Sequence, residues 1–265
     1  MWRQEGSLGF VPTMGALHEG HLSLIRRSIM DNRFTAVSIF VNPTQFNDRN
    51  DFNHYPRNLE NDLESMSSLP VDLIFAPAAS EIYPEPDTRI FDFGHLDKTM
   101  EGRYRPGHFN GVAQVVSKLL EIVRPDKTYF GEKDFQQLAI VRELVRQLEI
   151  PVEVIGCPII READGLAMSS RNKLLAPEQR TAAAGISKAL SQAQKLAGKI
   201  PVEELQEMIV EQINEDPLMK VEYFKIVARE DLRPVRDWSE AGAKIGCVAV
   251  QIGKVRLIDN VNISF

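Results

Sequence analysis

The stretch from Gly9 to Leu24 reads GFVPTMGALHEGHLSL, and the rest of the chain is arranged around it. Its first residues are apolar and predict the end of a buried strand, which Pro12 terminates because proline has no N–H to donate to a sheet. Gly15 and Gly20 allow a tight loop in which backbone can approach a ligand closely. From Leu22 to Asn32, apolar residues recur at helical spacing. The stretch therefore predicts a strand, a glycine-bearing loop and a helix start.

Two histidines, His18 and His21, lie three residues apart at this helix start. The unpaired N–H groups and the positive end of the helix dipole suit a phosphate. Each imidazole can donate a hydrogen bond to a phosphate oxygen, and a protonated imidazole adds positive charge. A metal pair is an alternative, although His-Glu-Gly-His differs from the His-Glu-x-x-His pattern of zinc proteases. No Gly-Lys-Ser/Thr follows, so this is not a Walker phosphate loop.

The composition is that of an ordinary globular protein: 265 residues, 43% hydrophobic and 26% charged. A net charge of −6 argues against a nucleic-acid partner, which favours a basic face. Cys157 and Cys247 lack metal-ligand spacing, and we expect buried thiols in a reducing compartment. No apolar run approaches the roughly 20 residues of a membrane span. The opening MWRQEGSLGF is not a signal peptide, so we expect a cytoplasmic protein without membrane contact.

Alternating strands and helices predict an α/β fold with a Rossmann-like, doubly wound parallel sheet. Besides the first strand, this part of the chain predicts strands at Thr35 to Val41, Val71 to Ala76, Lys127 to Phe130 and Pro151 to Ile155, a short edge strand at Ile90 to Phe93, and helices at Leu59 to Met66, at Gly111 to Val123 and from Asp134. Ligands of such sheets bind beyond the carboxyl ends of the strands.

The chain changes character near Ile159, which predicts two domains, 1–158 and 159–265. The second is expected to be a smaller α+β lid domain with antiparallel strands. Its predicted helices are Pro177 to Ala197 and Val202 to Asn214, and its predicted strands are Val221 to Val227, Ile245 to Ile252 and Val255 to Ile258, the last two joined by a Gly253-Lys254 hairpin turn.

Four loops carry chemistry. Gln45 follows a strand and can hydrogen-bond a substrate, or it is a solvated loop residue. In EGRYRPGHFNG, Arg103, Arg105 and His108 can present charge to an anion, and a solvated loop fits equally well. Lys133 opposes the dipole at a helix start, which hints at an anionic ligand, or is simply exposed. Two hydroxyls and a guanidinium in Met168 to Asn172 suit a polyphosphate, or form an N-cap beside an exposed arginine.

The polar and aromatic stretch from Asn47 to Arg57 has no periodicity. A stretch of this kind is either a lid or a long surface loop. We take it as a candidate lid with Tyr55 at its tip.

These stretches together resemble one family, the pantothenate synthetases or pantoate–β-alanine ligases of the nucleotidyltransferase superfamily. The matching segments are PTMGALHEGH at Pro12 to His21, SIFVNPTQF at Ser38 to Phe46, RPGHFNGV at Arg105 to Val112, YFGEKDFQQ at Tyr129 to Gln137 and MSSRN at Met168 to Asn172. They occur in the family's order and spacing, and the resemblance covers nearly the whole chain. His18-Glu19-Gly20-His21 is similar to the superfamily's His-x-Gly-His signature.

The resemblance implies an ATP-dependent condensation of pantoate with β-alanine through a pantoyl adenylate, with Mg²⁺ as cofactor and a homodimer as assembly. It gives catalytic roles to His21 (the proton donor), His18, Lys133 and Arg171. Gln45 and Gln137 match residues that hold pantoate, and the Ile160 backbone matches a position that meets adenine. The other implied ATP contacts are Met14, Gly15, Ala16, Leu17, Glu19, Gly20, Gly131, Glu132, Asp134, Met168, Ser169 and Ser170, and no residue is indicated for the metal.

Two other functions share parts of the pattern. Another nucleotidyltransferase, acting on a phosphate or a tRNA-linked substrate, would share the histidine loop. A non-catalytic nucleotide-binding protein is the third reading, because only MWRQEGSLGF precedes Val11 where the family carries a longer strand and helix. We expect this short start to affect stability and oligomeric contacts more than chemistry.

Overall fold

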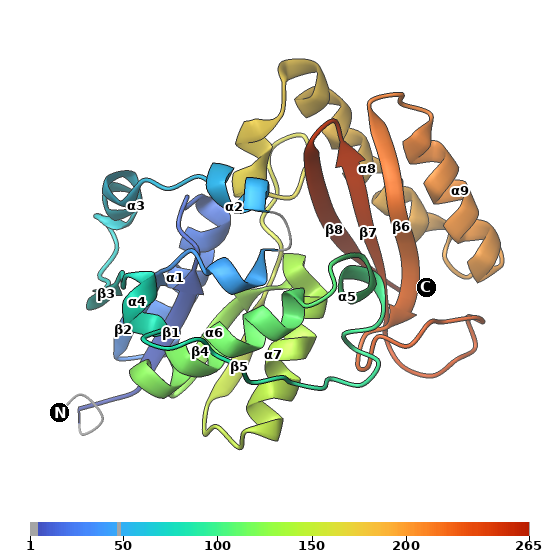
Figure 1. Ribbon diagram of the computed structural model, residues 1–265. Coiled ribbons are helices and arrows are strands. Elements are labelled where there is room, and N and C mark those ends of the chain that lie inside the picture. The colour runs from blue at the N-terminus through green and yellow to red at the C-terminus, as the bar shows by residue number, and fades with distance from the viewer. Residues whose placement is uncertain (1–4, 47–48, 265) are drawn as a thin grey trace. The chain divides into compact units, whose positions relative to one another are not determined.

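A computed structural model of the chain describes residues 5–46 and 49–264. The chain divides into two compact units, Met1–Pro158 and Ile159–Phe265. Each unit has its own sheet (Figure 1). Each also has its own apolar core.

The first unit is built on five parallel strands in the order β3-β2-β1-β4-β5. This confirms the predicted doubly wound sheet. The strand order reverses between β1 and β4, which are neighbours in space although most of the unit separates them in sequence. The strands are β1 (Leu8–Thr13), β2 (Phe34–Ile39), β3 (Leu73–Phe75), β4 (Lys127–Gly131) and β5 (Glu153–Cys157).

Helices cover both faces of this sheet, and the side chains of β1 alternate between them. Phe10 packs with residues of α6 and α7, whereas Val11 packs with residues of α1 and with Met66 of α3. The helices of the unit are α1 (Glu19–Asp31), α2 (Arg49–His54), α3 (Leu59–Met66), α4 (Ala79–Ile82), α5 (Met100–Tyr104), α6 (His108–Val123) and α7 (Phe135–Gln147), with 3-10 turns η2 (Pro43–Gln45) and η3 (Glu132–Asp134).

Pro12 does not end the first strand, contrary to the prediction. β1 continues to Thr13, whose carbonyl accepts a hydrogen bond from the Phe40 N–H at 3.0 Å. Thr13 therefore faces β2, and Pro12 faces β4. The pairing of β1 with β4 ends at Phe10, so the N–H that proline lacks is not needed there.

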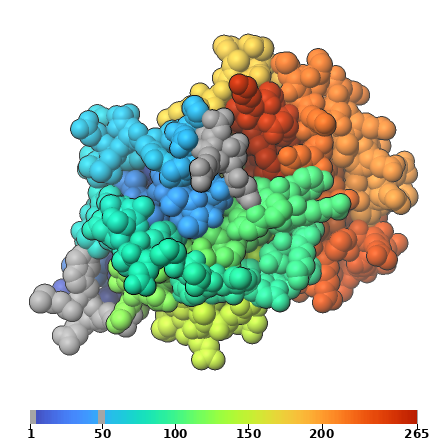
Figure 2. All heavy atoms as spheres, in the orientation of Figure 1, coloured from blue at the N-terminus to red at the C-terminus, as the bar shows by residue number. Residues whose placement is uncertain are grey.

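The predicted edge strand at Ile90 to Phe93 was wrong. Side chains of α6 take up the backbone groups that a neighbouring strand would use: Asn110 accepts from the Phe91 N–H at 2.9 Å and donates to the Arg89 carbonyl at 3.1 Å. Figure 2 shows the segment between α4 and α5 on the surface of this unit. The segment is irregular because these bonds are to helix side chains rather than to a strand.

Helix α6 begins at His108, three residues before the predicted start at Gly111. The candidate lid is also different from the prediction, because most of it forms the short helix α2. Asn47 and Asp48 of that stretch lie outside the described residues.

The second unit carries the predicted antiparallel sheet, in the order β6-β7-β8. The hairpin turn at Gly253-Lys254 is confirmed by the pairing of Ile252 with Val255 across it and by a φ of 57° at Gly253. All three strands are longer than predicted. The elements are η4 (Ser170–Leu174), α8 (Pro177–Leu196), α9 (Val202–Asn214), β6 (Met219–Ala228), β7 (Lys244–Ile252) and β8 (Val255–Ile263).

Each unit contains one cysteine, and both side chains are buried, as expected. Cys157 is the last residue of β5 and Cys247 lies in β7. Among the helices that the structure describes, none has the length and apolar character needed to cross a membrane.

Candidate active site

The reversal of strand order between β1 and β4 places two loops beside each other at the carboxyl edge of the sheet. In open α/β sheets this is where ligands bind. Residues 14–18 follow β1, residues 40–46 follow β2, and η3 follows β4. The predicted site residues of the first unit therefore lie on adjacent segments, although they are distant in sequence.

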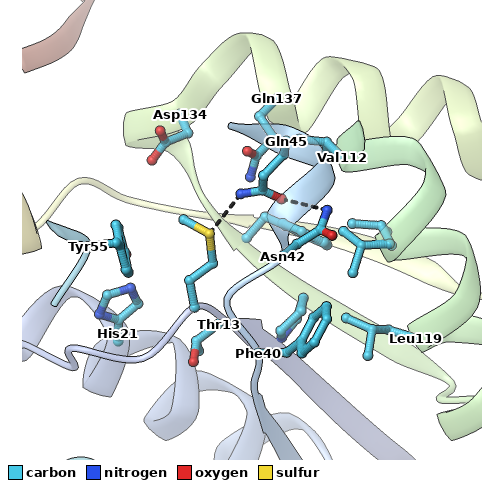
Figure 3. Close-up of a pocket in the computed structure, with 15 residues that line it drawn as sticks. Thr13, His21, Phe40, Asn42, Gln45, Tyr55, Val112, Leu119, Asp134 and Gln137 are labelled. Atoms are coloured by element: carbon cyan, nitrogen blue, oxygen red, sulfur yellow. Dashed lines mark hydrogen bonds between the residues drawn. The ribbon is translucent and has the colours of Figure 1, made fainter. Parts of the chain in front are cut away.

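A cavity of about 160 Å³ opens at this edge. Gln45 and Gln137, the two glutamines expected to hold a substrate, both line it (Figure 3). His21 and Asp134 line it as well. The remaining wall is largely apolar, and α6 contributes four of its residues. This wall consists of Pro12, Thr13, Met14, Phe40, Asn42, Tyr55, Val112, Val115, Val116, Leu119 and Phe130. The cavity suits a small ligand that has one apolar and one polar side.

Asn42 sets the orientation of the Gln45 side chain. Its Nδ2 lies 3.3 Å from Gln45 Oε1 and 3.0 Å from the Gly111 carbonyl, and its Oδ1 accepts from the Tyr83 hydroxyl at 2.9 Å. Because Gln45 Oε1 accepts from Asn42, its amide nitrogen turns toward Met14, whose sulfur lies 2.7 Å away (Figure 3). A thioether is a weak acceptor, so a ligand oxygen can readily replace it.

The two histidines cap the helix that follows them. His18 is the N-cap of α1, and its Nδ1 accepts from the Gly20 N–H at 3.1 Å. His21 Nδ1 accepts from the His18 N–H at 3.4 Å, and the two ring centroids are 4.1 Å apart. An Nδ1 that accepts leaves the proton of a neutral imidazole on Nε2. Each ring therefore carries its proton on Nε2, at the helix start.

His21 is neutral near pH 7. Burial, His18 and Lys133, in decreasing order, lower its pKa from 6.5 to about 3. We expected that a protonated imidazole could add charge here, but in the protein without ligand His21 contributes a hydrogen-bond donor rather than a charge. Lys133 supplies a charge nearby, and its side chain is only 18% exposed, with Nζ 3.6 Å from Asp134 Oδ2. It is thus not the exposed lysine that we considered as an alternative.

Asp62 holds the loop between β1 and α1, and sequence reasoning missed it. This carboxylate on α3 is 3% exposed and accepts from the backbone N–H groups of Ala16 at 3.0 Å and Leu17 at 2.7 Å. Ala16 has a φ of 49°, which L-residues rarely adopt. A Cβ on Gly15 would lie 2.7 Å from Asp62 Oδ2, so glycine lets the carboxylate approach.

Tyr55 does not stand at the tip of a lid. Its side chain is 6% exposed and lines the cavity, and its ring lies edge-on to Phe46 at 5.6 Å. In Figure 3, Tyr55 and His21 are neighbours on the same side of the cavity. Tyr55 is therefore part of the cavity wall.

The remaining predicted contacts lie in the second unit, where they form one group. The Met168 N–H donates to the Ile160 carbonyl at 3.0 Å, which brings the expected adenine position beside the expected phosphate loop. Ser169 caps η4 by accepting from the Arg171 N–H at 3.3 Å. Asn172 donates to Glu162 at 2.8 Å, and Arg180 donates to Glu162 at the same distance. Ser169 is thus an N-cap, as the alternative interpretation proposed, within a loop that Glu162 ties to α8.

A sequence model of the family described as pantoate-beta-alanine ligase matches residues 1–262. The chain belongs to this family. Among its relatives, the pantothenate synthetase of Bacteroides thetaiotaomicron is 52% identical to it over 258 residues. The match covers 97% of this chain and 92% of the relative's chain. That of Porphyromonas gingivalis W83 is 49% identical over 260 residues, covering 98% and 92%.

Solved structures of the pantoate-beta-alanine ligase family have the same fold. The pantothenate synthetase of Thermus thermophilus superimposes with a TM-score of 0.92 at 46% identity, over 96% of this chain and 92% of its own. The pantoate-beta-alanine ligase of Francisella tularensis, solved in complex with beta-gamma ATP and beta-alanine, has a TM-score of 0.82 at 39% identity, over 98% and 90%.

Proposed function

We propose that the protein catalyses the ATP-dependent condensation of pantoate with β-alanine, giving pantothenate, AMP and pyrophosphate. The observation that carries the proposal is the cavity at the β1–β4 edge, in which Gln45 and Gln137 face an apolar wall beside His21. The family to which the chain belongs supports this reaction, and a relative solved with beta-gamma ATP and beta-alanine supports these substrates.

Pantoate matches both sides of the cavity. It is a short acid with two hydroxyl groups and two methyl groups on one carbon. The methyl groups would pack on Val112, Val116 and Leu119 of the apolar wall, and the hydroxyl and carboxylate oxygens would accept from the glutamine amides. The Gln45 amide would exchange the Met14 sulfur for a pantoate oxygen.

In the first step a pantoate carboxylate oxygen forms a bond to the α-phosphorus of ATP, and the bond from that phosphorus to the bridging oxygen breaks. Pyrophosphate leaves with that electron pair. Lys133 and Arg171 would stabilise the negative charge that develops on the pyrophosphate. The Nε2–H groups of His18 and His21 would donate to phosphate oxygens, and His21 would be the proton donor that the family resemblance implies. ATP would contact the predicted loops at Met14 to His21 and Gly131 to Asp134.

In the second step the amine of β-alanine forms a bond to the acyl carbon of pantoyl adenylate. The bond from that carbon to the phosphate oxygen breaks, AMP leaves with that electron pair, and the amine nitrogen loses its proton to water. Neither step needs a covalent enzyme intermediate, so positioning and electrostatics carry the rate. The adenylate is sensitive to water, which favours a covered site.

The second unit would complete the site as a lid. Ile160 would meet the adenine, and Met168, Ser169, Ser170 and Arg171 would bind the phosphates. The hydrogen bond between Met168 and Ile160 supports one common ligand for both segments. The proposal further includes a homodimer in the cytoplasm. Buried cysteines and the use of ATP support that location.

Mg²⁺ belongs to the proposal as a partner of ATP. Among the residues that the structure describes, no three His, Cys, Asp or Glu side chains cluster as a cation cage. Mg²⁺ usually keeps several waters and is held through substrate phosphates and one or two carboxylates. A single protein carboxylate beside the phosphates of ATP therefore fits the ion. Asp134, a carboxylate on the cavity wall, would be the protein's contribution. When bound, the ion would neutralise phosphate charge.

The test is exchange of labelled pyrophosphate into ATP, with pantoate present and β-alanine absent. We expect exchange, because adenylate formation is a separate and reversible step. Lys133→Ala should abolish it, whereas Lys98→Ala, which removes a well-exposed lysine, should leave it unchanged. Tight ATP binding without exchange would indicate a non-catalytic protein. Exchange that needs a phosphorylated acceptor instead of pantoate would indicate another nucleotidyltransferase. Exchange that needs β-alanine would indicate a different order of steps.

A further inference from the structure

Arg105 and His108, two polar residues that the sequence analysis singled out, have no role in the proposed reaction so far. We expected Arg105 and His108 either to present charge to an anion or to lie in a solvated loop. The structure contradicts both expectations for His108. This residue is only 6% exposed, and it is the first residue of helix α6 rather than part of a solvated loop. Its Nδ1 lies 2.8 Å from the backbone carbonyl oxygen of Gln45, and its Nε2 lies 3.2 Å from Arg105 Nη1.

The partners of His108 fix where its proton lies. A guanidinium has only donors, so Nε2 must accept from Arg105. The proton of the neutral ring is then on Nδ1, and Nδ1–H donates to the Gln45 carbonyl. Burial and the nearby Arg105 charge lower the pKa of His108 from 6.5 to about 4, against weaker raising effects of the Gln45 carbonyl, Glu101 and Asp134. The ring therefore stays neutral, with this tautomer, at pH 7.

The same helix presses on the turn that carries Gln45. A Cβ on Gly111 would lie 2.4 Å from the Thr44 carbonyl oxygen and 2.7 Å from Gln45 Cα, so glycine is needed for this approach. The Gly111 carbonyl also accepts from Asn42, which orients the Gln45 amide. Helix α6 thus holds the Gln45 backbone through His108 and its side chain through Asn42.

We propose that His108, oriented by Arg105, is a positioning residue that sets where the Gln45 amide stands in the cavity and thereby the affinity for pantoate. The inference rests on the proposed function, because it takes Gln45 as a pantoate contact. His108 itself does not line the cavity. It acts through the backbone of a residue that does.

Two amide variants distinguish the contributions of the two ring nitrogens of His108. His108→Asn places an amide nitrogen on Cγ, where Nδ1 was, and so keeps a donor for the Gln45 carbonyl. His108→Gln moves the amide one carbon further, so it can still accept from Arg105 but loses the donor. We expect His108→Gln to raise the KM for pantoate about tenfold, with the KM for ATP within about twofold, and His108→Asn to restore most of the affinity.

Gln114→Leu is the matched control. Gln114 is a buried polar residue on the same helix, and its Nε2 donates to the carbonyls of Asp87 and Arg89 at 2.9 Å. We expect it to lower the melting temperature without changing the KM for pantoate. A general loss of stability in α6 would instead raise the pantoate KM in Gln114→Leu as it does in His108→Gln.

A double variant tests whether His108 acts through Gln45. In a Gln45→Ala background, His108→Gln should change the KM for pantoate by less than about twofold, since the positioned amide is gone. A pantoate KM unchanged by His108→Gln, or a tenfold rise that persists in Gln45→Ala, would overturn the inference. A wild-type protein without pantoate-dependent exchange would instead refute the proposed function.

Discussion

His21 combines two properties that a phosphate-binding imidazole needs. Its Nδ1 accepts from the His18 N–H, and its lowered pKa keeps the ring neutral. A second proton would have to bind Nδ1, which already has a donor as its partner. His21 would therefore meet a phosphate as a neutral Nε2–H donor in a fixed orientation.

We predict that His21→Ala folds and loses turnover by about 10² to 10³, the usual effect of removing one donor aimed at developing charge. His21→Gln should retain more activity, because its amide can still donate toward the phosphate. Steady-state rates and thermal melting of both variants check this. Near-native turnover in a folded His21→Ala protein would exclude the assignment.

Single residues were predicted where their chemistry is local. His18, His21 and Lys133 follow from the loop and helix start in which they lie, and Gln45 from the strand before it. Asp62 and Tyr83 could not be predicted, because they act across long sequence separations on backbone N–H groups and on Asn42. The sequence held no signal for Asp62 either, because only the structure distinguishes this buried carboxylate from the other acidic residues of its helix.

Among the elements, the loop from Met14 to Leu17 depends on one carboxylate. Asp62→Ala would leave two backbone N–H groups without their acceptor, at a cost of roughly 1–3 kcal/mol each if they stay buried. We predict a rise of tenfold or more in the KM for ATP and a smaller effect on pantoate. Gly15→Ala should act in the same direction, since its Cβ would displace the same carboxylate.

Substrate-varied kinetics of both variants provide the measurement. Asp72→Ala is the control, because Asp72 also accepts a backbone N–H, from Thr35 at 2.8 Å, but on β2 rather than on the loop. We expect it to leave the KM for ATP unchanged. Equal effects of Asp62→Ala and Asp72→Ala on ATP would contradict a specific role of the loop.

Elements whose pattern comes from their own burial were predicted well, as for α3 at Leu59–Met66 and α9 at Val202–Asn214. Errors occurred where tertiary contacts decide. Ile90 to Phe93 is apolar enough for a strand, but Asn110 occupies its backbone. Pro12 breaks a strand only where a neighbour needs its N–H, and the pairing of β1 with β4 ends at Phe10, before it reaches Pro12.

At the scale of the whole molecule, two histidines with lowered pKa values make stability depend on pH. The pKa values of His21 and His108 are about 3 and about 4 in the folded protein, against an ordinary value of 6.5. Between these values the unfolded chain binds protons that the folded protein does not. The stabilisation is therefore complete above about pH 7 and decreases as the pH falls toward 4.

We predict that the urea midpoint of unfolding falls steadily from about pH 7 to pH 4. His21→Gln should show a shallower decrease than the wild type over this range, because one of the two groups no longer titrates. Unfolding curves at matched pH values measure the difference. Parallel pH profiles of the two proteins would show that His21 does not contribute.

The two buried cysteines have a practical consequence. Burial raises the pKa of Cys157 to about 11, and Cys247 is only 7% exposed, so neither should react with a maleimide in the folded protein. A cysteine introduced on the surface of either unit could then carry a fluorophore without replacement of the natural thiols. The emission of that dye would report whether its surroundings within the labelled unit change when ATP or pantoate binds.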